Sequence, residues 1–198
     1  EAVQLFIERA RSHEPEIEWG ETELAEIAHL TIRLDGIPLA IEMAAALIGT
    51  LSVGEILSRL DDRFRLLTGG GGRNLGRQQT LLATVDWSHD LLSEPERVLL
   101  RRLEVMSGPF SLEDVEAVCV GDGIDATQVV SILRRLVATS WVMRERGGDR
   151  AAYRLLETSR QYALDKLVSS SEAQRFRSKH SEWFADLAET GADHGSGE

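Results

Sequence analysis

The chain has 198 residues, of which 42% are hydrophobic, so it is long enough to bury the core of one large domain or two small ones. Its single cysteine, Cys119, excludes a disulfide framework and a cysteine-based zinc site. The formal net charge of −11 disfavours nonspecific binding to nucleic acid, because phosphates are contacted by a surplus of lysine and arginine. No apolar run reaches the roughly 18 residues of a membrane span, and no signal-peptide pattern is present. We therefore expect a cytoplasmic protein with no membrane partner.

The first third of the chain shows helical periodicity that is interrupted by a glycine and a proline. We expect helices over residues 1–12, 22–34, 38–48 and 53–60. The sequence Gly36-Ile37-Pro38 predicts an elbow, because glycine ends a helix with positive φ and proline fixes φ at the start of the next one. The following helix has Glu42 as its only charge, so we expect it to be buried.

A cluster of glycines at residues 69–77 has no apolar periodicity and predicts a flexible linker. A phosphate-binding loop would need a preceding strand and a Gly-Lys-Ser/Thr ending, and the sequence has neither. We therefore expect the linker to separate a helical domain, residues 1–68, from a second domain, residues 78–168.

The second domain begins with a helix at residues 79–92 and then shows a regular order of elements. We expect three helices, over residues 94–106, 112–118 and 126–140, and two short strands, over residues 141–145 and 151–156. Between the strands, Gly147-Gly148 is a strong signal for a hairpin. Three helices followed by a hairpin predict a winged helix, in which residues 126–140 form the recognition helix.

The predicted recognition helix has an apolar and a polar face. The apolar positions are Val129, Leu133, Leu136 and Val137, and the polar positions are Gln128, Ser131, Arg134 and Arg135. The two arginines are candidates for contacts with DNA phosphates, together with the hairpin arginines Arg144, Arg146 and Arg150. Residues 126–166 carry eight Lys/Arg against four Asp/Glu, whereas residues 1–60 carry four against eleven. The alternative is a solvated face, or a surface docked on another acidic domain.

Other candidate sites in the sequence have simpler explanations. The run Asp86 to Asp90, DWSHD, has the residue types of a hydrolase triad, but neighbours on a helix do not converge on one point. We expect Trp87 and Leu91 to face the core and the polar groups to face solvent. The histidines at positions 13, 29, 180 and 194 lack the spacing of a metal-binding pair. We therefore expect no catalytic residue and no metal site.

The last part of the sequence predicts helices over residues 157–168 and 171–190. An apolar stripe on the second helix has no evident partner in the rest of the chain; it consists of Phe176, His180, Trp183, Phe184 and Leu187. We therefore expect residues 169–198 to be the first helix of a helical repeat region and a polar tail, with a longer protein continuing beyond them.

Four segments of the sequence resemble one protein family in the same order. They are LDGIPLAIEMAAALI, LDDRFRLLTGG, DWSHDLLSEPERVLLRRL and YRLLETSRQYALDKL. Together they resemble the region after the P-loop domain in bacterial signal-transduction ATPases with numerous domains, the STAND class related to NB-ARC proteins. The resemblance implies an ARC-like helical domain, a winged helix and the start of a tetratricopeptide-like region. Such proteins are typically transcriptional regulators, including regulators of the LuxR family.

The resemblance also implies which residues meet a nucleotide. In the family the Gly-x-Pro elbow packs against an adenine nucleotide held by the P-loop domain, so Gly36, Ile37 and Pro38 take that role here. The family's Met-His-Asp motif aligns with Leu155, Leu156 and Glu157. Leu156 stands where the family has a histidine that touches the phosphate, and Glu157 is expected to keep the acidic helix-capping role.

From this resemblance we expect a regulatory fragment that acts as a nucleotide-dependent lid and lever. Its cofactor is ATP or ADP in the full-length protein and none in this chain alone, which lacks the P-loop and is not an enzyme. Its expected partners are an upstream P-loop domain, downstream helical repeats and its own copies on activation, with any DNA contact made through another domain. The alternative is a winged-helix DNA-binding module of a transcription factor.

Overall fold

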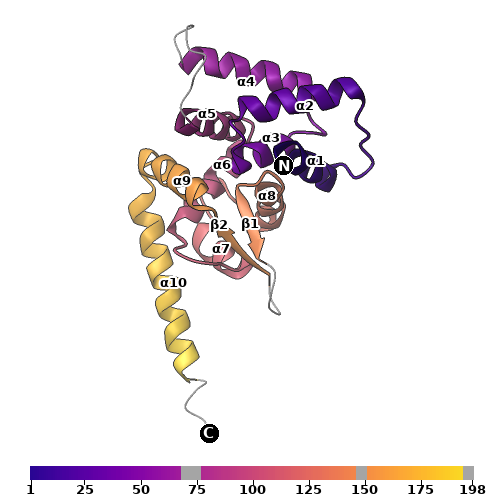
Figure 1. Ribbon diagram of the computed structural model, residues 1–198. Helices are drawn as coiled ribbons and strands as arrows, with labels where there is room; N and C mark the ends of the chain where they lie inside the picture. Colours follow the sequence, from indigo (N-terminus) through magenta and orange to yellow (C-terminus); the bar gives the residue numbers. More distant parts are fainter. Residues whose placement is uncertain (68–76, 146–150, 194–198) are drawn as a thin grey trace. The chain divides into compact units, whose positions relative to one another are not determined.

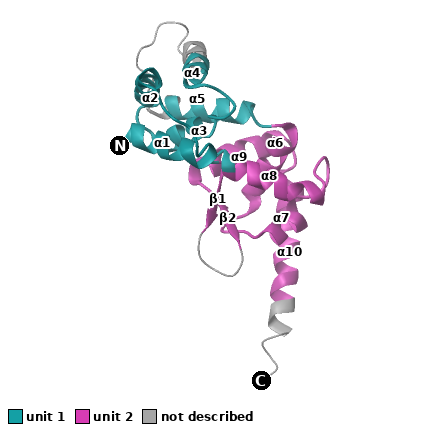
Figure 2. Cartoon of the chain, turned by 90° about the vertical axis from the view of Figure 1, so that its right-hand side faces the viewer, with its two compact units in different colours: residues 1–92, 138–140 teal, residues 93–137, 141–198 magenta. Residues whose placement is uncertain are grey.

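The computed structural model describes residues 1–67, 77–145 and 151–193, and the chain divides into two compact units (Figures 1 and 2). Unit 1 comprises residues 1–92 with 138–140, and unit 2 comprises residues 93–137 with 141–198. The described part of the chain is mainly helical with one small antiparallel hairpin, which confirms the predicted fold class. None of the described helices is long and apolar enough to cross a membrane.

Unit 1 is a bundle of helices around an apolar core. Its helices are α1 (Ala2–His13), α2 (Glu21–Arg33), α3 (Pro38–Ala45), α4 (Val53–Leu67) and α5 (Arg77–Asp90). Helix α1 packs on α3, α3 on α5, and α4 on both α2 and α5. Helix α3 is buried on almost every side, as predicted, and its alanines at positions 40, 44 and 45 allow the neighbouring helices to approach closely.

Two helix ends in unit 1 differ from the sequence prediction. Helix α3 ends at Ala45, three residues before the predicted end at Ile48, and the chain continues in turns that remain buried. Helix α4 extends to Leu67, beyond the predicted end at Leu60.

The elbow between α2 and α3 begins one residue earlier than the glycine suggests. Asp35 has a φ of 52° and Gly36 a φ of 63°, so both adopt the left-handed conformation. The Gly36 N–H donates to the Thr31 carbonyl and the Asp35 N–H to the Ile32 carbonyl, each at 3.0 Å, which is the Schellman pattern with Asp35 at the left-handed position. Pro38 then starts α3, as predicted. The Thr80 hydroxyl of α5 donates to Asp35 Oδ2 at 2.6 Å and holds this conformation.

Helix α5 belongs to unit 1 by packing, although the sequence pattern predicted it as part of the second domain. It packs on α3 and α4, so the boundary between the units falls after residue 92. The predicted linker at residues 69–77 lies almost wholly outside the described residues. Trp87 is buried as expected, but the placement of two neighbours was wrong: Ser88 is buried and Leu91 is exposed. Because α5 ends at Asp90, Leu91 leaves the helical face and Leu92 is buried in its place.

Unit 2 contains the winged helix. Its elements are α6 (Glu94–Arg102), the 3₁₀ turn η1 (Leu103–Val105), α7 (Leu112–Cys119), α8 (Ala126–Ala138), β1 (Val142–Glu145), β2 (Ala152–Leu155), α9 (Glu157–Ser169) and α10 (Ala173–Asp193). In the hairpin, Val142 lies opposite Leu155. Phe110 and Tyr153 exchange two backbone hydrogen bonds of 2.8 Å, which form an isolated antiparallel bridge between β2 and the segment before α7. The predicted turn residues Gly147 and Gly148 lie outside the described residues.

Helix α10 packs against the winged helix, and the expectation that its apolar stripe lacks a partner was wrong. Phe176 is fully buried, and Trp183 Nε1 donates to Asp114 Oδ1 of α7 at 2.9 Å. Only the far end of the stripe, Phe184 and Leu187, remains about 40% exposed. The stripe therefore docks on α7 and η1 through its first half.

A buried arginine joins three parts of unit 2. Arg102, at the end of α6, is fully buried, and its guanidinium lies 4.3 Å from the centre of the Phe176 ring. It donates to the carbonyls of Cys119, Gly121 and Asp122 at 2.6–3.1 Å and to Glu172 Oε1 at 2.7 Å. Arg102 thereby connects α6, the turn between α7 and α8, and the start of α10.

Replacing Arg102 should strongly destabilise unit 2. We expect Arg102→Met to lower the free energy of unfolding by about 3–5 kcal/mol, because it removes the donor of three backbone carbonyls and one of the two arginines that pair with the Glu172 carboxylate. The exposed Arg177 of α10 is the matched control, and Arg177→Met should change stability by no more than about 0.5 kcal/mol. Urea denaturation followed through the amide signals of unit 2 measures both; equal effects of the two variants would contradict the assignment.

Candidate functional site

Helix α8 presents a polar outer face in unit 2. Gln128, Ser131, Arg134 and Arg135 are exposed, as predicted, while Val129, Leu133 and Leu136 are buried. Ile132 is also buried, which the sequence analysis missed, and Val137 is only half-buried. The outer face of α8 therefore offers hydroxyl, amide and guanidinium groups, the side chains with which recognition helices contact DNA.

The start of α8 is fixed by a local carboxylate. Asp125 Oδ1 accepts from the Thr127 N–H at 2.8 Å and from the Thr127 hydroxyl at 2.7 Å. These hydrogen bonds lower the pKa of Asp125 below its ordinary value. The helix start is also held by Gln128, since the Asp125 N–H donates to Gln128 Oε1 at 3.3 Å. A negative charge thus stands at the helix N-terminus, where a phosphate would otherwise be favoured.

The hairpin contributes one described candidate arginine. Arg144 of β1 is exposed, whereas Arg146 and Arg150 lie outside the described residues. A neighbouring arginine of β2, Arg154, is paired with Glu145 at 3.1 Å. Of the arginines predicted to contact phosphates, the structure therefore describes Arg134 and Arg135 on α8 and Arg144 on β1.

The turn between α7 and α8 is held by basic side chains that the sequence analysis did not single out. Gly121, Asp122 and Gly123 all have positive φ, so the chain reverses sharply here. Lys179 Nζ of α10 donates to the Val120 carbonyl at 2.9 Å, and Arg175 of α10 is paired with Asp122. The available signal was spacing: residues 175, 179 and 183 recur every four positions and lie on one face of α10.

Two partly buried carboxylates link α10 to α6 and to α7. Burial alone would raise the pKa of Glu172, but hydrogen bonds from Arg102 and Arg101 outweigh it and lower the pKa below its ordinary value. The pKa of Asp114 is lowered in the same way: burial opposes the shift, and hydrogen bonds from Trp183 and Ser111 produce it. Both groups are therefore held as carboxylates in the folded chain.

The elbow in unit 1 is exposed at the positions that matter for a ligand. Gly36 and Pro38 are exposed and Ile37 is half-buried. A Cβ added at Gly36 would meet no atom within 4 Å, so the glycine is required by its positive φ rather than by lack of space. The proline ring offers a flat apolar surface without a hydrogen-bonding group.

The other predicted nucleotide-contact residues lie at the start of α9 in unit 2. Leu156 is the N-cap residue of α9 and is half-buried. The expectation that Glu157 caps the helix was wrong, because Glu157 is the first residue inside the helix. There its exposed carboxylate interacts favourably with the positive end of the helix dipole but accepts no capping hydrogen bond. The elbow and this helix start belong to different units and are described separately.

The single cysteine lies in the core of unit 2. Cys119 is fully buried, and burial raises the pKa of its thiol to about 12, which makes it unreactive at neutral pH. In the part of the chain that the structure describes, no group of three or more His, Cys, Asp or Glu is arranged to hold a metal ion.

Comparison with known proteins identifies a domain within unit 2 and finds relatives over nearly the whole chain. Residues 92–168 match the model of a winged helix-turn-helix domain. The chain is 45% identical over 188 residues to a protein of Mycobacterium tuberculosis provisionally named an HTH-type transcriptional regulator, and to its counterpart in Mycobacterium bovis. The alignment covers 95% of this chain and 21% of each of those proteins.

A second relative from Mycobacterium tuberculosis is named only as an uncharacterized protein. It is 45% identical over 174 residues, which is 87% of this chain and 44% of the relative. The chain thus contains a winged helix-turn-helix domain and is homologous to part of proteins named as transcriptional regulators, of which it spans about a fifth.

The lowered pKa values predict that unit 2 loses stability in acid. Because Asp114 and Glu172 bind protons less readily when folded, their contribution is complete above their ordinary pKa values of 3.8 and 4.5. This contribution to stability is lost as the pH falls below 3.8–4.5 and through the lowered pKa values of the folded chain. We expect Glu172→Gln to reduce stability at neutral pH and to flatten this acid dependence.

Thermal melting of both forms across that pH range measures the effect. Glu182→Gln, at an exposed position of the same helix, should keep the wild-type profile. A Glu172→Gln variant with an unchanged acid dependence would show that this carboxylate does not couple folding to protonation.

Proposed function

We propose that this chain is the regulatory part of a STAND-type transcriptional regulator, in which unit 1 acts as a nucleotide-dependent lid and unit 2 as the lever. The nucleotide, ATP or ADP, is held by a P-loop domain outside this sequence, so the chain itself performs no catalysis. The homology to proteins named as HTH-type transcriptional regulators supports the regulatory role. The P-loop domain and nucleotide are inferred from the four sequence segments that resemble the family.

The exposed elbow is the observation that carries the proposal. Two successive left-handed residues and a proline fix the backbone from Asp35 to Pro38, and the 2.6 Å hydrogen bond from Thr80 ties that backbone to α5. A rigid apolar edge of this kind can lie on an adenine base, because it requires no polar partner and loses little entropy on binding.

The switching step requires a nucleotide that distinguishes two arrangements of the units. A ligand shifts such an equilibrium only by its difference in affinity for the two states. ADP contacts to the elbow favour one state in this proposal, and loss of those contacts releases unit 2 to downstream helical repeats or to a second copy of the protein. Leu156 cannot donate a hydrogen bond to a phosphate, so the elbow carries more of the nucleotide contact here than in relatives with histidine.

A second function, direct DNA binding by the winged helix, is favoured by the exposed Arg134, Arg135 and Arg144. The net charge of −11 opposes it, because long-range repulsion slows and weakens the approach of DNA. The carboxylate of Asp125 at the start of α8 opposes it locally, since that end of a recognition helix lies nearest the bases. We therefore place α8 against acidic surface of the same protein rather than in a major groove.

The elbow predicts opposite effects of two substitutions on ADP release from the full-length protein. Pro38→Ala should hasten release by removing the surface under the base, and Leu156→His should slow it by adding a charge-assisted hydrogen bond. Such a bond contributes about 1.5–3 kcal/mol, or roughly ten- to a hundredfold in the dissociation rate. Stopped-flow measurement with a fluorescent ADP analogue gives both rates.

Pro95→Ala is the matched control for the first substitution, because Pro95 also occupies the first turn of a helix, α6. It should leave ADP release unchanged. If Leu156→His keeps the wild-type release rate and lowers the melting temperature, Leu156 is a packing residue and its assignment to the nucleotide is refuted.

Duplex DNA should bind this chain weakly and without dependence on α8. Fluorescence anisotropy at low salt measures the affinity of the wild type and of the double variant Arg134→Ala/Arg135→Ala. Binding in the sub-micromolar range that falls steeply with salt and disappears in the double variant would establish the second function in place of the first.

A further inference from the structure

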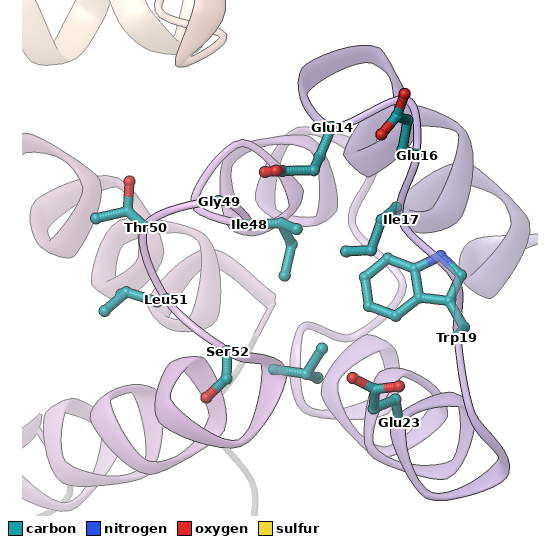
Figure 3. A pocket seen from close by; sticks show the side chains of 11 residues that line it. Glu14, Glu16, Ile17, Trp19, Glu23, Ile48, Gly49, Thr50, Leu51 and Ser52 are labelled. Atoms are coloured by element: carbon teal, nitrogen blue, oxygen red, sulfur yellow. The ribbon is translucent and has the colours of Figure 1, made fainter.

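A pocket in unit 1 lies away from the elbow, at the other end of α3. Its volume is about 490 Å³, within the range of about 300–1,000 Å³ typical of small-molecule sites. It is lined by the loop between α1 and α2, the turn between α3 and α4, and the first residues of α2 and α4 (Figure 3). All of these segments belong to unit 1.

The middle of the pocket is apolar and aromatic. Ile17, Ile48 and the indole of Trp19 lie side by side there (Figure 3). The indole is held from behind by Phe6, whose ring centre lies 6.2 Å away in an edge-to-face arrangement. Since Phe6 is fully buried in the core of unit 1, the aromatic wall has a fixed position.

Carboxylates surround this apolar centre. Glu14, Glu16 and Glu23 lie around it in Figure 3, and none of the described residues that line the pocket is a lysine or an arginine. Glycine at position 49, with a φ of 91°, lets the Glu14 carboxylate lie against the backbone, because a Cβ there would stand 2.7 Å from Glu14 Oε2. The side chain of Glu14 is thereby kept at the edge of the pocket.

The helix N-termini at the pocket do not make it an anion site. Helices α2 and α4 both begin there, and each N-terminus already has its own carboxylate: the Gly20 N–H donates to Glu23 Oε2 and the Ser52 N–H to Glu55 Oε2, both at 2.8 Å. An anion would find these donors occupied and would face Glu14 and Glu16. A cation, by contrast, would be attracted by the carboxylates that line the pocket.

We propose that this pocket binds a small organic cation, an ammonium compound with an alkyl or aryl body. The body would cover Ile17, Ile48 and the indole of Trp19, and the ammonium group would lie among Glu14, Glu16 and Glu23. Apolar burial and attraction to the indole then add to the charge pairing. This assignment is independent of the elbow and of the nucleotide.

Three probes with the same aromatic body and different charge test the assignment: phenethylammonium, phenethyl alcohol and hydrocinnamate. Each is titrated into the ¹⁵N-labelled chain, and the indole signal of Trp19 and the amide signal of Gly49 are followed. We expect saturable shifts with the ammonium compound, weaker binding of the alcohol and none of the carboxylate. Equal affinities for the ammonium compound and the alcohol, or no saturation at Trp19, would overturn the proposal.

Variants of the rim provide the second arm of the experiment. Glu14→Gln and Glu16→Gln should each weaken binding of phenethylammonium by about two- to fivefold, the range for an exposed ion pair. Glu18→Gln removes the same charge from an exposed residue of the same loop that does not line the pocket, and it should leave the affinity unchanged. A loss as large in Glu18→Gln as in the rim variants would show only a general charge effect and would refute the site.

Discussion

The structure of unit 2 depends on the burial of one guanidinium group, that of Arg102. A charge removed from water must be compensated by hydrogen bonds and an opposite charge. Arg102 finds this compensation only where three segments meet: the carbonyls of residues 119, 121 and 122, the carboxylate of Glu172 and the ring of Phe176. Displacing any of the three leaves buried polar groups unpaired, so α6, the α7–α8 turn and α10 are held as one structure.

Side chains of α6 and α10 also fix the turn before the recognition helix. The α7–α8 turn determines where the recognition helix begins, and it is bound by Arg102 from α6 and by Arg175 and Lys179 from α10. Trp183 reaches Asp114 at the other end of α7. Helix α10 therefore contacts both ends of α7. In the proposed lever, α10 is the part through which neighbouring domains act.

Local sequence signals predicted the elements well, because helix periodicity, caps and the hairpin depend on near neighbours. Most described helices and both strands lie close to the predicted ranges, although α4 ends at residue 67 instead of 60 and α6 at residue 102 instead of 106. The winged helix followed from the order of the elements. The partners of α5 and α10 were missed because they depend on long-range contacts: Trp183 and Asp114 are 69 positions apart, and Thr80 and Asp35 are 45 apart. Asp35 was missed as the left-handed residue because glycine next to it satisfies the usual pattern.

The candidate sites were predicted to different degrees. The exposure of Arg134 and Arg135 followed from helical periodicity, whereas the Trp19 pocket had no signal, since its walls come from two loops and two helix starts. The role of the elbow rests on a family resemblance to which the structure adds a rigid, exposed backbone. Its nucleotide remains a prediction.

Native-state hydrogen exchange of the whole chain tests most directly whether α10 is an integral part of the winged-helix unit. If Arg102, Lys179 and Trp183 hold α10 in place, its amides from Phe176 to Trp183 should exchange with the same opening free energy as those of α7. If those amides exchange as rapidly as in an isolated helix while α7 and α8 remain protected, α10 opens independently and the account is contradicted.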